Sequence, residues 1–237
     1  MPSRAWWRTA PGTPAPNTEL VAVVAVIAAY AIASSVIGEP WQTGLAVAVS
    51  VVGLLLARRA GIGAEELGLG RAHAGPGLRW GIVISLGVVT VVALAALLPW
   101  TRSFFDDDRY SDATAEDVAF DALVRIPIGT ALFEEWLFRG VLLALLLHRF
   151  RPDLAVTASA ALFGLWHVLP ALGFADSNAA VADGTVELFV VPVTVVVTAI
   201  AGAFFAWTKI RSSSLIAPTL VHASMNSSAV VAAWLVG

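Results

Sequence analysis

The sequence of 237 residues contains no cysteine and has few charged residues. Without cysteine the protein can form no disulfide, no thiolate metal site and no cysteine nucleophile. Charged residues make up 13% of the chain, whereas a soluble domain carries roughly 25%. The sequence also lacks a glycine-rich phosphate loop and a basic patch interspersed with aromatic residues, so nothing indicates a nucleic-acid partner.

Hydrophobic residues, by contrast, make up 58% of the chain and gather in long runs. A helix needs about 20 apolar residues to cross the hydrocarbon core of a bilayer. The sequence therefore predicts an all-α, polytopic transmembrane bundle of about seven spans. The expected spans are residues 20–37, 44–57, 80–100, 126–147, 154–173, 188–207 and 214–236. The run at 188–207 is rich in valine, as strands are, but its length favours a helix.

The first apolar run follows a polar, proline-rich segment with basic residues, at residues 1–19. This is also the arrangement of a cleaved signal peptide, but the run is longer than the apolar part of a usual one. We therefore expect a retained helix, which Glu39 and Pro40 should end.

Other local signals place helix ends further along the chain. Thr114 and Asp117 have the spacing of a capping box, which should open a short amphipathic helix. Pro127 suits the first turn of the fourth span. Pro170 should kink or end the fifth span, and residues 208–211 should form a turn after the sixth.

Basic residues are distributed unequally between the two sides that seven spans would define. With the N-terminus inside, the inner segments hold ten lysine and arginine side chains, and the outer segments hold Arg102, Arg109 and Arg125. This positive-inside pattern predicts an inner N-terminus and an outer C-terminus. The 13 arginines against one lysine, with abundant alanine and valine, indicate a high-GC bacterial source and hence a bacterial plasma membrane.

The fourth span contains three ionisable residues, Glu134, Glu135 and Arg139. Each costs roughly 2.5–3.5 kcal/mol to insert at bilayer depth, so their presence indicates a functional site. Glu135 and Arg139 are four residues apart in the order that favours an intrahelical ion pair. Glu134 points about 100° away and has no such partner. We therefore assign the pair to structure and polarisation, and Glu134 to acid–base chemistry.

Polar residues of two later spans should lie at a depth similar to that of Glu134. At 1.5 Å per residue, His167, His222 and Asn226 are about 12–21 Å from the inner face, as Glu134 is. A carboxylate, two imidazoles and an amide can activate a water molecule. Glu134 would take its proton with help from His167, and His222 and Asn226 would donate hydrogen bonds to the oxyanion.

The neighbours of these residues have simpler expected roles. Trp136, Phe163 and Trp166 should be packing residues that shape the cavity. Serines follow His222 at positions 224, 227 and 228, but serines in membrane helices usually bond to backbone carbonyls of their own helix. We therefore do not expect a serine nucleophile.

Three motifs combine these residues in chain order: Glu134-Glu135-xxx-Arg139, Phe163-xxx-His167 and His222-xxx-Asn226. They resemble the motifs of the CPBP family, the CAAX-protease and bacteriocin-processing (Abi) family of intramembrane glutamic endopeptidases. The resemblance extends from about residue 120 to the C-terminus. It implies that Glu134 and His167 activate the water, and that His222 and Asn226 form the oxyanion hole.

The resemblance also implies a division of the chain into three parts. Residues 1–19 would be a cytoplasmic segment, 20–118 a variable transmembrane region, and 119–237 the catalytic helical core. The substrate would be a membrane-associated peptide or protein, reached from the cytoplasm and the bilayer. Eukaryotic relatives remove the last three residues of prenylated CAAX proteins, but prenylated substrates are not expected in a bacterium.

Three alternatives remain open from the sequence. Glu134, His167 and His222 are plausible zinc ligands, although no HExxH motif is present and the glutamic mechanism requires no cofactor. A non-catalytic peptide-binding or bacteriocin-immunity protein would use the same pocket without hydrolysis. A proton-coupled transporter would use Glu134 and the histidines as a relay, but the sequence shows no inverted repeat.

Overall fold

The computed structural model describes residues 17–38, 41–177 and 184–237, and every regular element in these ranges is helical. Six of the described helices are long and apolar enough to cross a membrane. The expected fold class, a polytopic helical bundle, is therefore confirmed. The number of spans and the orientation of the N-terminus stay predictions. Most of segment 1–19 and the expected helix end at Glu39 and Pro40 lie outside the described residues.

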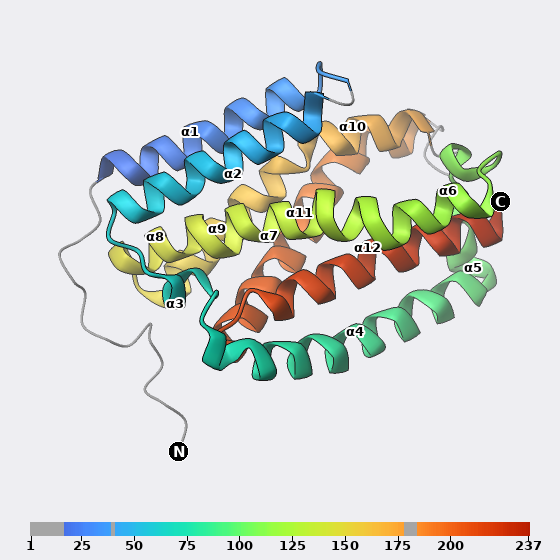
Figure 1. Ribbon diagram of the computed structural model, residues 1–237. Helices are drawn as coiled ribbons and strands as arrows, with labels where there is room; N and C mark the ends of the chain where they lie inside the picture. Colours follow the sequence, from blue (N-terminus) through green and yellow to red (C-terminus); the bar gives the residue numbers. More distant parts are fainter. Residues whose placement is uncertain (1–16, 39–40, 178–183) are drawn as a thin grey trace.

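Two helical pairs form opposite sides of the bundle (Figure 1). On one side α1 (Asn17–Ser34) packs against α2 (Trp41–Arg59). On the other side α4 (Ala74–Leu97) packs along α12 (Ile216–Val236). Short elements join them: α3 (Ala64–Leu67), η2 (Arg71–His73), α5 (Pro99–Arg102), η3 (Ser103–Phe105) and η4 (Asp108–Tyr110).

One continuous helical run, residues 115–149, passes between these pairs and is called the central helix below (Figure 1). It consists of α6 (Ala115–Phe120), η5 (Asp121–Leu132), α7 (Phe133–Glu135), η6 (Trp136–Leu142) and α8 (Leu143–Arg149). Its η5 and η6 parts are π-helical, with i→i+5 hydrogen bonds that widen the turn. Residues 137–146 are all buried, so other helices enclose the half of the central helix that follows Trp136.

The start of the central helix agrees with the sequence in one respect and differs in another. Thr114 and Asp117 form the expected capping box, in which Asp117 N–H donates to Thr114 Oγ1 at 3.2 Å and Thr114 N–H to Asp117 Oδ2 at 3.1 Å. The expectation that Pro127 begins a helix is wrong, because the helix continues from Ala115. The missing N–H of Pro127 falls in η5, where the α-helical hydrogen-bond pattern is already interrupted.

The fifth expected span is divided into two helices. α9 (Pro152–Trp166) ends just before His167, and α10 (Val168–Ser177) begins just after it. Pro170 lies in the first turn of α10, where its missing N–H costs no helical hydrogen bond. The expected interruption at Pro170 is thus confirmed, and it leaves His167 at the joint between two helices.

The sixth expected span continues further than the sequence indicated. α11 (Gly184–Ser212) includes residues 208–211, so the turn predicted there is wrong. Lys209 is fully buried and its ammonium group donates to the Glu66 carbonyl oxygen at 2.7 Å. Because this contact lets the helix bury a charged residue, the chain turns only at Ser213, which has φ 52°.

α9 and α11 approach each other closely at Gly164. A Cβ atom at Gly164 would lie 2.5 Å from the carbonyl oxygen of Val195 and 3.0 Å from the Cβ of Ala199. We therefore expect Gly164→Ala to separate the helices and to lower stability by about 1–3 kcal/mol, measured as a lower melting temperature in detergent. Gly87→Ala is the control, because a Cβ at that helical glycine meets no atom within 4 Å. It should be neutral or stabilise by up to about 1 kcal/mol, and equal melting of the two variants would contradict the close approach.

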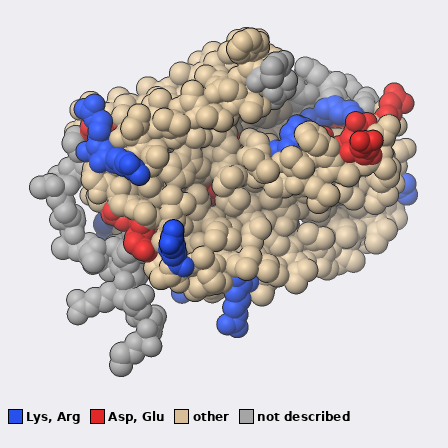
Figure 2. All heavy atoms as spheres, in the orientation of Figure 1, with Lys and Arg blue, Asp and Glu red and all other residues tan. Residues whose placement is uncertain are grey.

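The surface of the bundle is apolar over a broad zone between its ends. In Figure 2 charged side chains gather toward the two ends, and few lie between them. Large apolar side chains on α4 are well exposed, with Val83, Leu86 and Val91 each more than 60% accessible. A soluble protein rarely exposes so much contiguous apolar surface, so these faces suit contact with lipid.

Candidate active site

A buried ion pair lies at the centre of the site. Arg139 Nη1 is 3.0 Å from Glu135 Oε1, and neither side chain is accessible to solvent. The guanidinium also lies against two aromatic rings, 4.0 Å from the centre of Phe163 and 5.1 Å from that of Phe205. The i,i+4 spacing on the central helix brings the two charges together, and the rings enclose them.

The same carboxylate also holds His222 of α12. His222 Nδ1 is 2.9 Å from Glu135 Oε1, and the Phe205 ring stacks on the imidazole at 4.8 Å. A carboxylate only accepts hydrogen bonds, so Nδ1 is the donor. His222 Nε2 then faces the other way, 3.2 Å from Asn226 Nδ2 and 3.9 Å from Glu134 Oε2. Glu135 thereby fixes which nitrogen of His222 faces Glu134.

Glu134 is buried, with 8% of its surface accessible. Its Oε1 atom accepts a hydrogen bond from Trp166 Nε1 at 3.2 Å. Its Oε2 atom is buried without a hydrogen-bond partner among the described residues. Trp166 was expected only to pack, and the structure adds a polar contact to that role.

His167 is oriented by its own helix. Its Nδ1 atom is 2.8 Å from the carbonyl oxygen of Phe163. Because a carbonyl only accepts, Nδ1 carries a proton, and in the neutral ring Nε2 then has the lone pair. The Phe163 ring lies between the two imidazoles, with its centre 4.6 Å from that of His167 and 5.9 Å from that of His222. The described hydrogen bond of His167 thus stays within the α9–α10 segment and does not go to Glu134.

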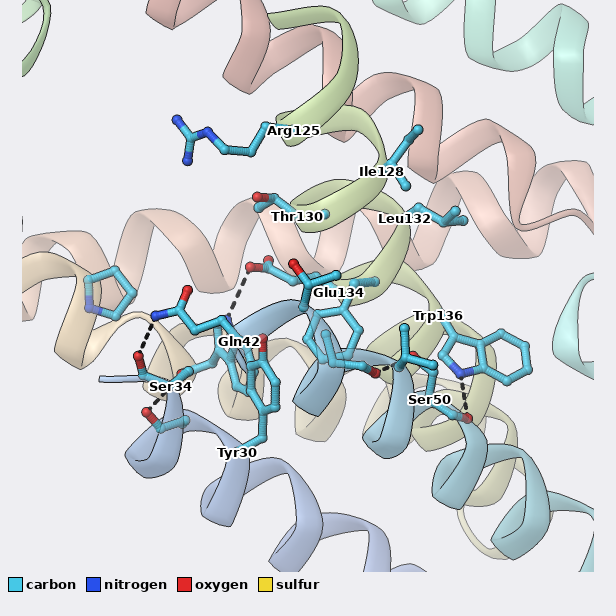
Figure 3. A pocket seen from close by; sticks show the side chains of 18 of the residues that line it. Tyr30, Ser34, Gln42, Ser50, Arg125, Ile128, Thr130, Leu132, Glu134 and Trp136 are labelled. Carbon is cyan, nitrogen blue, oxygen red and sulfur yellow. Dashed lines mark hydrogen bonds between the residues drawn. The ribbon is translucent and has the colours of Figure 1, made fainter. Parts of the chain in front are cut away.

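A cavity of about 1320 Å³ opens beside Glu134 (Figure 3). Its walls come from α1 and α2 on one side and from the central helix and the α9–α10 joint on the other. Figure 3 shows Arg125, Thr130 and Glu134 projecting toward one side of the central helix. The wide turns of η5 account for this, because nine residues of a regular α-helix make two and a half turns and would put Arg125 opposite Glu134.

Two residues of the cavity were not singled out from the sequence. Tyr30 of α1 stacks on Trp166, with ring centres 5.5 Å apart. Gln42 of α2 donates to the Ser34 and Ile37 carbonyl oxygens, which fixes the end of α1. Trp136 packs as expected, and its Nε1 donates to the Ser50 carbonyl oxygen of α2 at 3.2 Å. Neither Tyr30 nor Gln42 belongs to a motif, so only the folded structure could identify them.

Two serines that follow His222 differ in their hydrogen bonds, and only one of them bonds to its own helix as expected. Ser228 bonds to the carbonyl oxygen of Met225 in its own helix, as expected. Ser227 instead donates to the Ala122 carbonyl oxygen of the central helix at 2.7 Å.

Within residues 17–38, 41–177 and 184–237, no three histidine or acidic side chains are grouped so that they could hold a metal ion. The expectation that the site needs no cofactor stays a prediction.

Part of the chain matches a model of a known protein family. The model described as type II CAAX prenyl endopeptidase Rce1-like matches residues 118–228. Over this segment the chain is similar to the Rce1-like family. The matched residues contain all three motifs, and the resemblance to CPBP proteases is confirmed. The Rce1-like family consists of proteases, so the match supports a hydrolase. Together with the six long apolar helices, it supports a multi-pass membrane protein. The comparisons with curated proteins and with solved structures return no match.

The Rce1-like match and the cavity overlap only in part. The match begins at residue 118, whereas Tyr30, Gln42 and Ser50 on α1 and α2 line the cavity. One wall of the space beside Glu134 is therefore made by residues outside the family segment.

Proposed function

We propose that this Rce1-like protein is an intramembrane endopeptidase that hydrolyses a peptide bond of a membrane-associated protein or peptide. The observation that carries the proposal is Glu134 Oε2, a buried oxygen without a described partner, 3.9 Å from an imidazole and beside a large cavity. A carboxylate in such a place can accept a proton from water as the water attacks a carbonyl carbon.

The other residues supply orientation and charge stabilisation. The lone pair on His167 Nε2 can orient the attacking water or share its proton. Asn226 can donate a hydrogen bond to the oxyanion, and His222 can donate a second when its Nε2 also carries a proton. Glu135, 2.9 Å from the opposite nitrogen, balances the charge of that imidazolium. When the C–N bond breaks, Glu134 returns its proton to the leaving amine.

The proposed kind of substrate is inferred from the residues that line the cavity. Its lining is mainly apolar, with serine, threonine and glutamine side chains on the α1 and α2 wall. Such a space suits an extended apolar peptide whose backbone needs a few hydrogen-bond partners. We further assign the protein to a bacterial plasma membrane, on the basis of its excess of arginine over lysine.

The direct test uses purified full-length protein in detergent and a fluorogenic peptide library. Cleavage of at least one library peptide, followed by mass spectrometry of both fragments, would establish the reaction and locate the scissile bond. The same measurement on membranes from cells with and without the protein would reveal shortened natural substrates. If the wild type binds library peptides but never cleaves them, the binding or immunity alternative replaces the protease.

Treatment with chelators should leave the peptidase rate unchanged. The reason is that the described residues hold no set of ligands that fits a metal, and that His222 Nδ1 already pairs with Glu135. The rate is compared before and after incubation with 1,10-phenanthroline and after readdition of zinc. Loss of activity that zinc restores would show that the zinc-dependent alternative is right.

A further inference from the structure

The indole of Trp166 is the described hydrogen-bond donor to Glu134, through the 3.2 Å contact between Nε1 and Oε1. An indole N–H can only donate, so it binds the carboxylate without competing for the proton that Glu134 has to accept. The contact holds one oxygen in place and leaves the other, Oε2, for the water molecule. The orientation of the carboxylate is thus set from α9 rather than from the central helix.

Trp166 is itself held by aromatic rings from two other elements. Tyr30 of α1 stacks on it with ring centres 5.5 Å apart and planes 6° from parallel. Phe138 of the central helix meets it edge-on at 5.5 Å. Phe133 contacts both Tyr30 and Trp166, at 4.7 and 6.5 Å. Stacked and edge-on aromatic pairs stabilise one orientation of each ring, so α1 restricts the direction in which the indole N–H points.

We propose that Trp166, clamped by Tyr30, is a positioning residue that aims the Glu134 carboxylate at the attacking water. This proposal rests on the proposed peptidase function. It also extends the catalytic unit beyond the matched segment 118–228, because Tyr30 belongs to α1. The 119–237 segment expected from the sequence to be the catalytic core is then incomplete without the first helix.

The test is Trp166→Phe in the full chain, assayed with the library peptide that the wild type cleaves fastest. Phenylalanine keeps a ring for Tyr30 to stack on but removes the N–H. We expect kcat to fall roughly 10-fold, as for the loss of one hydrogen bond to a charged group. KM should change less than about twofold, because the bond acts on Glu134 and not on the bound peptide.

The clamp is tested separately at Tyr30. Tyr30→Phe keeps the stacked ring and should retain kcat better than Tyr30→Leu, which removes the ring. Trp234→Phe is the control, since Trp234 donates an equivalent bond to the Ala113 carbonyl oxygen at the far end of α12. This change should leave both kcat and KM at wild-type values.

The outcomes separate this proposal from the peptidase function itself. A wild type without cleavage would contradict the function. A Trp166→Phe enzyme with wild-type kcat, in a protein that does cleave, would overturn only the positioning role. The positioning role would also be overturned if Trp166→Phe changed KM alone. The same holds if its loss of activity follows a fall in melting temperature that Trp234→Phe shares, because a packing residue would behave in this way.

Discussion

Replacing Glu134 with glutamine should abolish peptide hydrolysis while the fold persists. Glutamine has the shape of glutamate and its amide oxygen can still accept the bond from Trp166, but it cannot take a proton from water. General-base catalysis contributes roughly 10²–10⁴-fold to a rate, and kcat should fall by that factor. The measurement is the rate of peptide cleavage by purified protein, together with the melting temperature of both forms.

The control for Glu134→Gln is Glu116→Gln. Glu116 is exposed on α6, so its replacement removes the same charge without touching the site and should leave the rate unchanged. A Glu134→Gln protein that cleaves at the wild-type rate would show that another group activates the water. If cells carrying this variant keep a protective phenotype that requires the protein, a binding function is favoured over hydrolysis.

Arg139→Met should destabilise the protein more than any other single change considered above. The substitution keeps an unbranched side chain but leaves Glu135 as a buried charge whose remaining described partner is His222. Removing one member of a buried pair costs about 3–5 kcal/mol, since Glu135 then stays buried without the guanidinium that balances its charge. We expect a large fall in melting temperature in detergent, or failure to accumulate in the membrane.

Two further variants distinguish charge imbalance from loss of packing. Glu135→Gln with Arg139→Met removes both charges and should recover much of the stability that Arg139→Met alone loses. Arg151→Met breaks the exposed pair with Asp153 and should have no measurable effect on melting. If the double variant melts as low as Arg139→Met, the guanidinium acts mainly through its contacts with Phe163 and Phe205.

The features that could be predicted from the sequence are those that depend on neighbours along the chain. The ion pair of Glu135 and Arg139 follows from i,i+4 spacing, and the capping box of Thr114 and Asp117 from a three-residue spacing. The long helices follow from the length of the apolar runs. The interruption near His167 follows from Pro170, whose ring and missing N–H act on the preceding turn.

The remaining features depend on contacts between distant parts of the chain. His222 meets Glu135 across 87 residues, and a spacing of that length carries no geometric information. The indole of Trp166 looked like a packing group because tryptophan in a helix usually is one. α11 continues past Lys209 because the Glu66 carbonyl accepts from it, and the sequence of α11 contains no sign of that partner.

The division of the cavity walls has a consequence for how this protein could be altered. The groups proposed to carry charge and protons lie on the central helix, the α9–α10 joint and α12. Much of the opposite wall belongs to a separate hairpin, α1 and α2. Residues such as Ser34, Thr43 and Val47 can therefore be exchanged to reshape the cavity without disturbing the pair of Glu135 and Arg139. In the proposed peptidase, changes of selectivity and changes of reactivity would therefore fall on different helices. Tyr30 belongs to both sets, because it lines the cavity and stacks on Trp166.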